Sequence, residues 1–211
     1  MSRNFLYSFP YSVLWIIVSA FHLIRLHRST NTTSPTNSNL LIIYGIGNGV
    51  VWTFNEYLIH RFVLHQCMYS IYHKIHHVYW TKALFSQQWF IASALFAYYL
   101  AFLRFFGEKA THQMFVFVPL YYVMFEWIHF VSHDTTVRKP VFLWVKYYHR
   151  LHHLDETCNY GITTPLWDWV FGTLHSDVVF GSKDILVALV PLVWFIRAPL
   201  PDKRRSQARL N

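Results

Sequence analysis

Two sets of closely spaced histidines constrain the fold of this chain more than any other feature. The chain has 211 residues and 14 histidines, and ten of these fall in residues 60–77 and 129–153, where an even spread would place about three. Each set is a spaced pair followed by His-x-x-His-His, so one pattern occurs twice. The ten residues are His60, His65, His73, His76, His77, His129, His133, His149, His152 and His153.

Helical geometry explains why these spacings suit a metal ion. Each residue of an α-helix advances by about 100°, so the three imidazoles of His-x-x-His-His fan over one face. His129 and His133 are four residues apart and also share a face. His60 and His65 are five apart, about 140° around a regular helix. That pair requires either a frayed helix end or a place on two different ions.

Long apolar runs separate the histidine sets and indicate a membrane protein. Hydrophobic residues make up 54% of the chain and charged residues 13%, against about 25% charged in ordinary soluble domains. A bilayer requires about 20 apolar residues per helix. Four runs approach that length and a fifth is weaker: 9–24, 40–59, 83–106, 113–132 and, more weakly, 185–200. We therefore expect an all-α integral membrane protein with about four transmembrane helices. The fifth run should lie along the membrane surface or dip into it.

Basic residues indicate the orientation of these helices. With a cytosolic N-terminus, eight Lys and Arg face the cytosol and four face the other side, in agreement with the positive-inside rule. Both histidine sets then lie on the cytosolic face, in a helical cap, and the Asn31 sequon lies in the lumen. Cys67 and Cys158 lie near the histidines in this reducing compartment, so we expect no disulfide.

The net charge of +8 does not indicate a nucleic-acid-binding protein, because no Lys/Arg-rich stripe occurs outside the C-terminal tail. No change in composition marks an internal boundary. We divide the chain into an N-terminal membrane helix and polar loop (1–39), a catalytic segment (40–182), and a C-terminal segment with a basic tail (183–211).

The number of histidines favours a redox site with two metal ions. Four ligands satisfy a structural zinc ion, whereas ten give two ions five each and leave one position open. Imidazole binds iron, zinc, copper and nickel, and redox iron suits this ligand set better than structural zinc. A purely structural role would leave many imidazoles near the bilayer without partners, which is costly. We interpret His22, His27 and His112 as polar residues at the membrane interface.

Two acidic residues inside apolar segments are candidates for orienting the ligands. Glu56 lies four residues before His60, and Glu126 lies three before His129. Either carboxylate could accept the second ring N–H of a ligand and fix its tautomer. The alternative is a solvated or snorkelling acid.

These segments resemble the fatty acid hydroxylase superfamily of integral membrane di-iron oxygenases, over roughly residues 48–175. NEYLIHRFVLH at 55–65 looks most like the fatty acid 2-hydroxylases, whereas YHKIHH at 72–77 looks more like the sterol oxidase branch. HFVSH and HRLHH follow the family spacing, and NYGITTPLWDWVFGTLH at 159–175 is similar to the family's ending.

The resemblance implies that the ten histidines hold two iron ions, for which zinc can substitute in purified protein. His175 aligns with the ending and is a further candidate ligand. The implied reaction uses O2 and external electrons to hydroxylate a lipid acyl chain in the endoplasmic reticulum membrane, as in a fatty acid or ceramide 2-hydroxylase. A sterol C4-methyl oxidase or sterol desaturase is the alternative within the superfamily.

Some family members carry a fused cytochrome b5 domain, for which no segment here has room. The resemblance therefore implies a separate electron donor, cytochrome b5 with its reductase. Two other classes of protein remain as alternatives: a membrane metal transporter and a bis-histidine haem protein. Transport sites usually lie near the membrane midplane, whereas these histidines gather at one face, and a haem would leave most of them unused.

Overall fold

The computed structural model describes five stretches of the chain, residues 3–30, 38–67, 70–79, 88–134 and 140–197. All secondary structure within these stretches is helical, in agreement with the expected class. The chain forms two compact units whose segments alternate along the sequence: 1–49 with 82–124, and 50–81 with 125–211.

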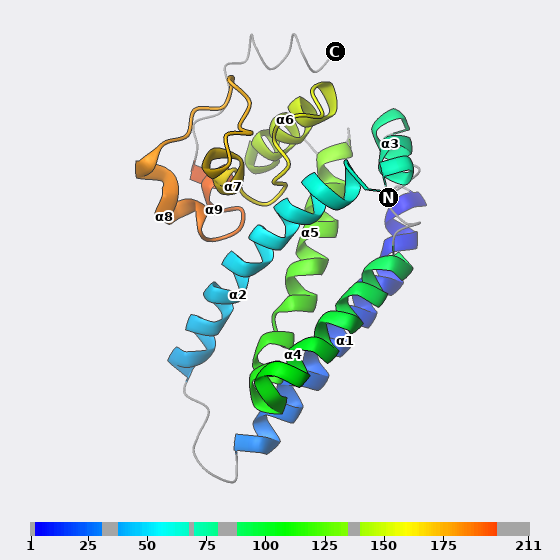
Figure 1. Cartoon of the computed structure of the whole chain (residues 1–211), viewed down its shortest axis with the longest axis vertical. Helices are drawn as coiled ribbons and strands as arrows, with labels where there is room; N and C mark the ends of the chain where they lie inside the picture. The colour runs from blue at the N-terminus through cyan, green and yellow to red at the C-terminus, as the bar shows by residue number, and fades with distance from the viewer. Residues whose placement is uncertain (1–2, 31–37, 68–69, 80–87, 135–139, 198–211) are drawn as a thin grey trace. The chain divides into compact units, whose positions relative to one another are not determined.

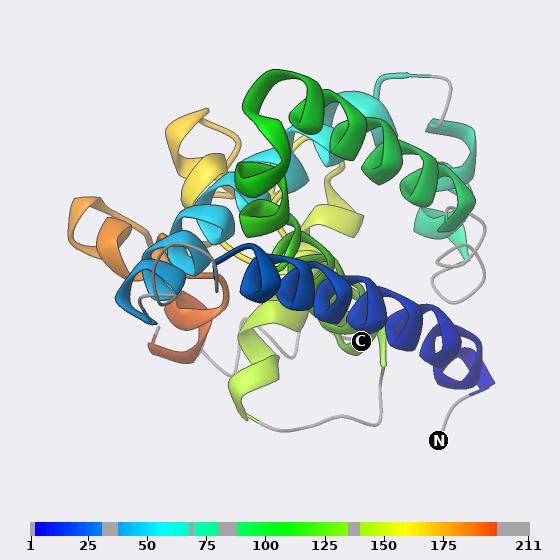
Figure 2. The same cartoon turned by 90° about the horizontal axis from the view of Figure 1, so that it is seen from below.

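The first unit is built from the long apolar runs. It contains α1 (Arg3–Thr30), α4 (Gln88–Phe115), and the first parts of α2 (Ser38–Leu58) and α5 (Val118–His133). The helices α1 and α4 run alongside each other (Figure 1, Figure 2). A break in α4 occurs at Gly107, where φ is 78°, a conformation that glycine adopts without steric cost.

Aromatic and polar contacts hold these helices together. Trp15 meets Tyr122 edge to face at 5.6 Å, and the Tyr121 hydroxyl donates to the carbonyl of Gly45 at 2.7 Å. His22 and His112, which we expected at the membrane interface, are both buried and form a pair with their Nδ1 atoms 2.7 Å apart. Each imidazole can be buried because the other supplies a hydrogen-bond partner for its ring nitrogen.

The described helices give only a partial account of the expected spans. The four main apolar runs coincide with α1, α2, α4 and α5. By length and composition, no described helix qualifies alone as a membrane span. One bent pair does, Ala92–Phe115 with Val118–His133, at an angle of 47°.

The second unit begins with the remainder of α2 and continues into a π-helical segment, η1 (Ile59–Leu64). Its other described helices are, in chain order, α3 (Ser70–Val78), the rest of α5, α6 (Pro140–Leu154), α7 (Leu166–Val170), η2 (Ser182–Asp184), α8 (Ile185–Ala188) and α9 (Val193–Arg197).

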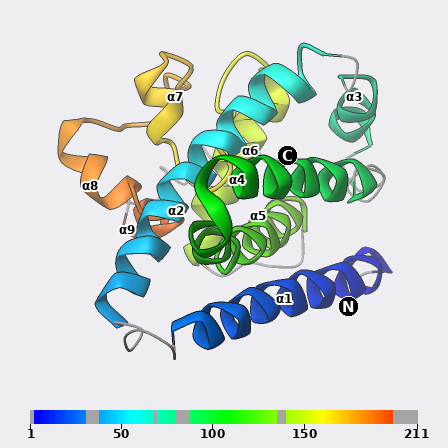
Figure 3. The same cartoon turned by 60° about the horizontal axis from the view of Figure 1, so that its bottom comes forward.

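The described part of the weak apolar run, residues 185–197, forms two short helices, α8 and α9, rather than one (Figure 3). Pro191 and the positive φ of Leu192 separate them. Part of α9 packs on α6, with the Trp194 ring 5.2 Å from that of Trp144. The Asn31 sequon and the basic tail from Lys203 to Arg205 lie outside the described residues.

Candidate metal centre

Four parts of the second unit bring the ten histidines together. His60 lies in η1 and His65 directly follows it. The helix α3 carries His73, His76 and His77, α5 carries His129 and His133, and α6 carries His149, His152 and His153.

The imidazoles form two groups, each with one ring nitrogen per residue lying within 4.8 Å of all the others. The first group is His60, His65, His73, His77 and His152. The second group is His76, His133, His149 and His153. His129 adjoins the second group, because its Nε2 lies 3.1 Å from that of His76 and 3.3 Å from that of His133.

The groups do not follow the two sequence sets. The middle histidine of each His-x-x-His-His crosses over: His76 joins the second group and His152 joins the first. On a helix, the middle histidine lies about 60° from the first histidine on one side, whereas the last histidine lies about 40° from it on the other side. The first group therefore consists of four residues from the first sequence set and one from the second, and the second group, once the adjoining His129 is counted, shows the reverse.

The π-helical segment explains the five-residue spacing of the first pair. A π-helix joins residue i to residue i+5, so residues five apart lie on one face. The rings of His60 and His65 are accordingly 5.1 Å apart and belong to the same group. The sequence pattern suggested a frayed end or two separate ions because it was projected onto a regular α-helix.

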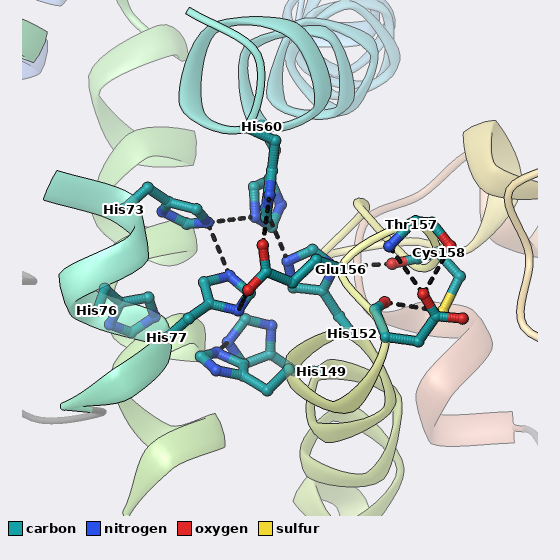
Figure 4. A network of polar contacts seen from close by, with 12 residues as sticks. His60, His73, His76, His77, His149, His152, Glu156, Thr157 and Cys158 are labelled. Carbon is teal, nitrogen blue, oxygen red and sulfur yellow. Dashed lines mark hydrogen bonds and ion pairs between the residues drawn. The ribbon is translucent and has the colours of Figure 1, made fainter. Parts of the chain in front are cut away.

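The ring nitrogens have the spacing that a metal ion requires. His73 Nε2 lies 3.0 Å from His60 Nε2 and 3.1 Å from His77 Nε2 (Figure 4). In the second group, His149 Nε2 lies 2.8 Å from His133 Nε2 and 3.0 Å from His153 Nε2. Imidazole nitrogens bound at right angles about 2.0–2.1 Å from an ion lie about 3 Å apart. The residues present therefore fit a metal ion in each group.

Backbone carbonyls fix the tautomer of two of these histidines. His60 Nδ1 lies 2.5 Å from the carbonyl oxygen of Tyr160, and His152 Nδ1 lies 2.7 Å from that of Cys158. Because a carbonyl oxygen only accepts, each Nδ1 carries the proton. Each Nε2 is then left with a lone pair directed into the first group, which is the form that binds a metal.

Burial keeps the imidazoles neutral. It lowers the pKa of His65 and of His77 to about 4, and that of His76 to about 3. For His65 and His76, the neighbouring His77 lowers the pKa further. A histidine must lose its ring proton before it can bind a metal, so these groups are ready to do so at neutral pH.

The loop that supplies both carbonyls is held by a buried carboxylate. Asp168, with no exposed surface, accepts hydrogen bonds from the backbone N–H groups of Tyr160 and Gly161, both at 2.8 Å. The hydroxyls of Tyr148 and Thr173 also donate to it, both at 2.7 Å. The NYGITTPLWDWVFGTLH segment thus forms a hydrogen-bonded support for the first group.

Glu56 also supports this loop rather than a histidine. It accepts from the backbone N–H of Ile162 at 2.5 Å and from the N–H and hydroxyl of Thr163 at 2.9 and 2.6 Å. From the sequence it was a candidate to accept the second ring N–H of a ligand. The carbonyl of Tyr160 faces the ring N–H of His60, and Glu56 accepts from the backbone N–H groups of the residues that follow. Glu126 lies half-buried in α5.

His175 belongs to neither group among the described residues. Its Nδ1 accepts from the backbone N–H of Asp177 at 3.1 Å. Its backbone N–H donates to the side-chain oxygen of Asn159 at 2.9 Å. It lies in the supporting loop.

Sequence reasoning did not find Glu156, whose carboxylate lies 3.6 Å from His65 Nδ1 and 3.5 Å from His77 Nδ1. Its position three residues after His153 was the one available signal. The carbonyls of Cys158 and Tyr160 left no signal, because every residue has a backbone carbonyl.

Comparison with known proteins finds similarity to lipid hydroxylases. Fatty acid 2-hydroxylase from Rattus norvegicus is 31% identical over 146 residues, which cover 61% of this chain and 38% of the rat protein. A dihydroceramide fatty acyl 2-hydroxylase from Arabidopsis thaliana is 28% identical over 194 residues, which cover 87% of this chain and 79% of that protein. A second Arabidopsis thaliana protein of that description is 31% identical and covers 64% of this chain. No solved structure matches the chain.

The match to a protein-family model is broader than the histidine motifs. The model of the fatty acid hydroxylase family covers residues 46–173, more than half of the chain. This range contains all ten grouped histidines and the supporting carboxylates Glu56 and Asp168, and it ends two residues before His175. The resemblance seen in the sequence is thereby confirmed, and the chain belongs to the fatty acid hydroxylase family.

Proposed function

We propose that this protein is a membrane di-iron oxygenase that uses O2 and external electrons to hydroxylate a lipid acyl chain at its 2-position, with a fatty acid or a ceramide as substrate. The observation that carries this proposal is the convergence of ten histidines in two groups, each with the nitrogen spacing of a metal site. The 2-hydroxylase names of the relatives support the position of the new hydroxyl group.

In this proposal the ten histidines are the metal ligands, five to each ion, with His129 completing the second group. The bound iron pair supplies the chemistry that reduces O2 and oxidises a C–H bond. Zinc also binds imidazole and can replace iron in purified protein. Redox iron fits the proposed activity because zinc does not change its oxidation state.

The chain's own residues prepare the site for this chemistry. The backbone carbonyls of Tyr160 and Cys158 orient His60 and His152. The Tyr160 ring lies 5.4 Å from that of His65 and 5.5 Å from that of His152, covering the first group on one side. Burial of most of these imidazoles limits the contact of the centre with water.

Membrane embedding is part of the proposal. Large apolar side chains point outward along α1, α2 and α4, including Ile17, Ile43 and Phe96, which are 59%, 62% and 62% exposed. Such extended apolar surfaces are rare on soluble monomers and suit lipid. We propose an endoplasmic reticulum location, with the histidine groups on the cytosolic face and residues 40–182 as the catalytic segment.

Electrons reach this site from a separate protein in our proposal, namely cytochrome b5 with its reductase. The basic balance of the chain suits an acidic partner during encounter. Reduced cytochrome b5 should support turnover by the purified, iron-loaded protein, measured as 2-hydroxy product formed per electron supplied. Absence of turnover with this donor would contradict the partner.

The substrate is tested by lipid analysis of cells that express the protein. Expression of the wild-type chain should raise 2-hydroxy acyl lipids, and His76→Ala should abolish the increase because it removes a ligand of the second group. His27→Ala, which changes an exposed histidine outside both groups, is the matched control and should retain the increase.

Unchanged 2-hydroxy lipids with the wild-type chain would contradict the proposal. A fall in 4-methyl sterols in the same extracts would instead favour the sterol oxidase alternative.

A further inference from the structure

The two histidine groups differ in what faces the outer nitrogen, Nδ1, of their rings. In the first group, His60 and His152 meet the backbone carbonyls of Tyr160 and Cys158. The Nδ1 atoms of two further histidines of this group face the carboxylate of Glu156. One of its carboxylate oxygens lies 3.6 Å from His65 Nδ1. The other lies 3.5 Å from His77 Nδ1 (Figure 4).

All four of these contacts come from one short segment of the chain. It supplies the side chain of Glu156 and then, at alternate residues, the carbonyls of Cys158 and Tyr160. It therefore places a negative or partly negative oxygen opposite four of the five imidazoles of the first group.

The second group lacks such support at two of its members. The Nδ1 atoms of His76 and His149 are buried and have no hydrogen-bond partner among the described residues. An imidazole whose outer N–H faces a carboxylate or carbonyl binds a metal more strongly, because its ring is fixed in orientation and its other nitrogen becomes more basic. The structure thus makes the two metal positions electrostatically unequal.

The turn that follows α6 explains why Glu156 is held in place. Asp155 accepts hydrogen bonds from the backbone N–H and the hydroxyl of Thr157, at 3.0 and 2.6 Å. The N–H of Cys158 donates to the carbonyl of Asp155 at 3.2 Å. These bonds close a tight turn around Glu156, whose side chain is 45% exposed at the edge of the first group.

Resting on the two-metal site proposed above, we propose that Glu156 is a positioning residue that makes the first group the tighter of the two metal positions. Its carboxylate acts on the ion through His65 and His77 and does not bind it directly. At 3.5–3.6 Å the contacts are longer than direct hydrogen bonds, so the effect is largely electrostatic.

The test is a titration of the metal-free full-length protein with Co²⁺ in detergent, followed by visible absorption and by competition with a chelator. The wild-type chain should bind two ions with different affinities. Glu156→Gln should weaken the tighter ion about 10- to 100-fold and leave the weaker ion unchanged. Glu156→Asp, which keeps the charge, should recover part of the affinity.

Glu108→Gln is the matched control, because it makes the same substitution at an exposed carboxylate that contacts Arg25 and His112 rather than a grouped histidine. It should bind both ions as the wild type does. Thermal unfolding of the metal-free variants separates a loss of affinity from a loss of fold, and we expect Glu156→Gln to match the wild type.

Each other outcome is informative. Two ions bound with unchanged affinities in Glu156→Gln would overturn the role of Glu156 and leave the two-metal site intact. Equal weakening of both ions, equal weakening by Glu108→Gln, or a less stable metal-free Glu156→Gln would also overturn it. Failure of the wild-type chain to bind Co²⁺ would contradict the proposed function itself.

Discussion

Gly161 shows how closely the supporting loop is packed behind the first group. A Cβ atom at this position would lie 2.2 Å from the carbonyl oxygen of Thr164 and 3.0 Å from a carboxylate oxygen of Asp168. Neither neighbour can yield easily, because one is backbone and the other is fixed by four hydrogen bonds. Only glycine fits here, directly after the carbonyl that orients His60.

Gly161→Ala should therefore destabilise the protein by about 1–3 kcal/mol, the usual effect of overpacking a filled interior. It should also lower metal occupancy, because the Tyr160 carbonyl must move away from His60. Thermal unfolding and elemental analysis measure the two effects. Gly181→Ala is the control, since its Cβ would meet no atom within 4 Å. A Gly161→Ala protein with wild-type stability would contradict the prediction.

At the level of elements, the π-helical segment amounts to one extra residue inserted between two ligands. A five-residue spacing on a π-helix places His60 and His65 on one face, as the four-residue spacing of His129 and His133 does on an α-helix. The two histidine pairs therefore achieve the same arrangement with different helical geometry.

Deletion of Phe62, which is 43% exposed, should convert the first pair to the spacing of the second. Because the segment can then become regular α-helix, we expect the protein to keep two metal ions per chain. Insertion of an alanine after Phe62 should turn His65 away and leave one ion per chain. Elemental analysis of the purified proteins measures both numbers. Retention of two ions after the insertion, or loss of one after the deletion, would show that the segment has another role.

The helices and the histidines were largely predictable from sequence, whereas the support of the site was not. Apolar runs of near-spanning length predicted α1, α2, α4 and α5, and the repeated spacing predicted the nine histidines of the two groups and the adjoining His129. The π-helical segment was missed because an α-helix is the default geometry. The actual partner of Glu56 was missed because it lies more than a hundred residues away in sequence.

At the level of the whole molecule, two cysteines report on the proposed orientation. Both are free thiols, and Cys67 is exposed whereas Cys158 is buried. Burial also raises the pKa of the Cys158 thiol to about 12, so it stays protonated and unreactive. Cys67 follows His65 by two residues and thus marks the face that carries the histidines.

In sealed microsomes with the cytosolic face outward, a membrane-impermeant maleimide should label Cys67 without detergent, because the proposed orientation exposes it to the medium. Gel-shift analysis measures the labelling, and Cys67→Ser should abolish it. Labelling of the wild-type chain only after detergent is added would place the histidine groups on the lumenal side.

The exchange of His76 and His152 between the groups has a consequence for how the protein matures. Under the proposed ligand assignment, the segment that leaves the ribosome first can offer an ion only four of its five nitrogens. The fifth belongs to α6, which is synthesised some 75 residues later. Under that assignment, neither ion acquires its full coordination until both segments have folded against each other, so complete coordination depends on the folding of the whole second unit.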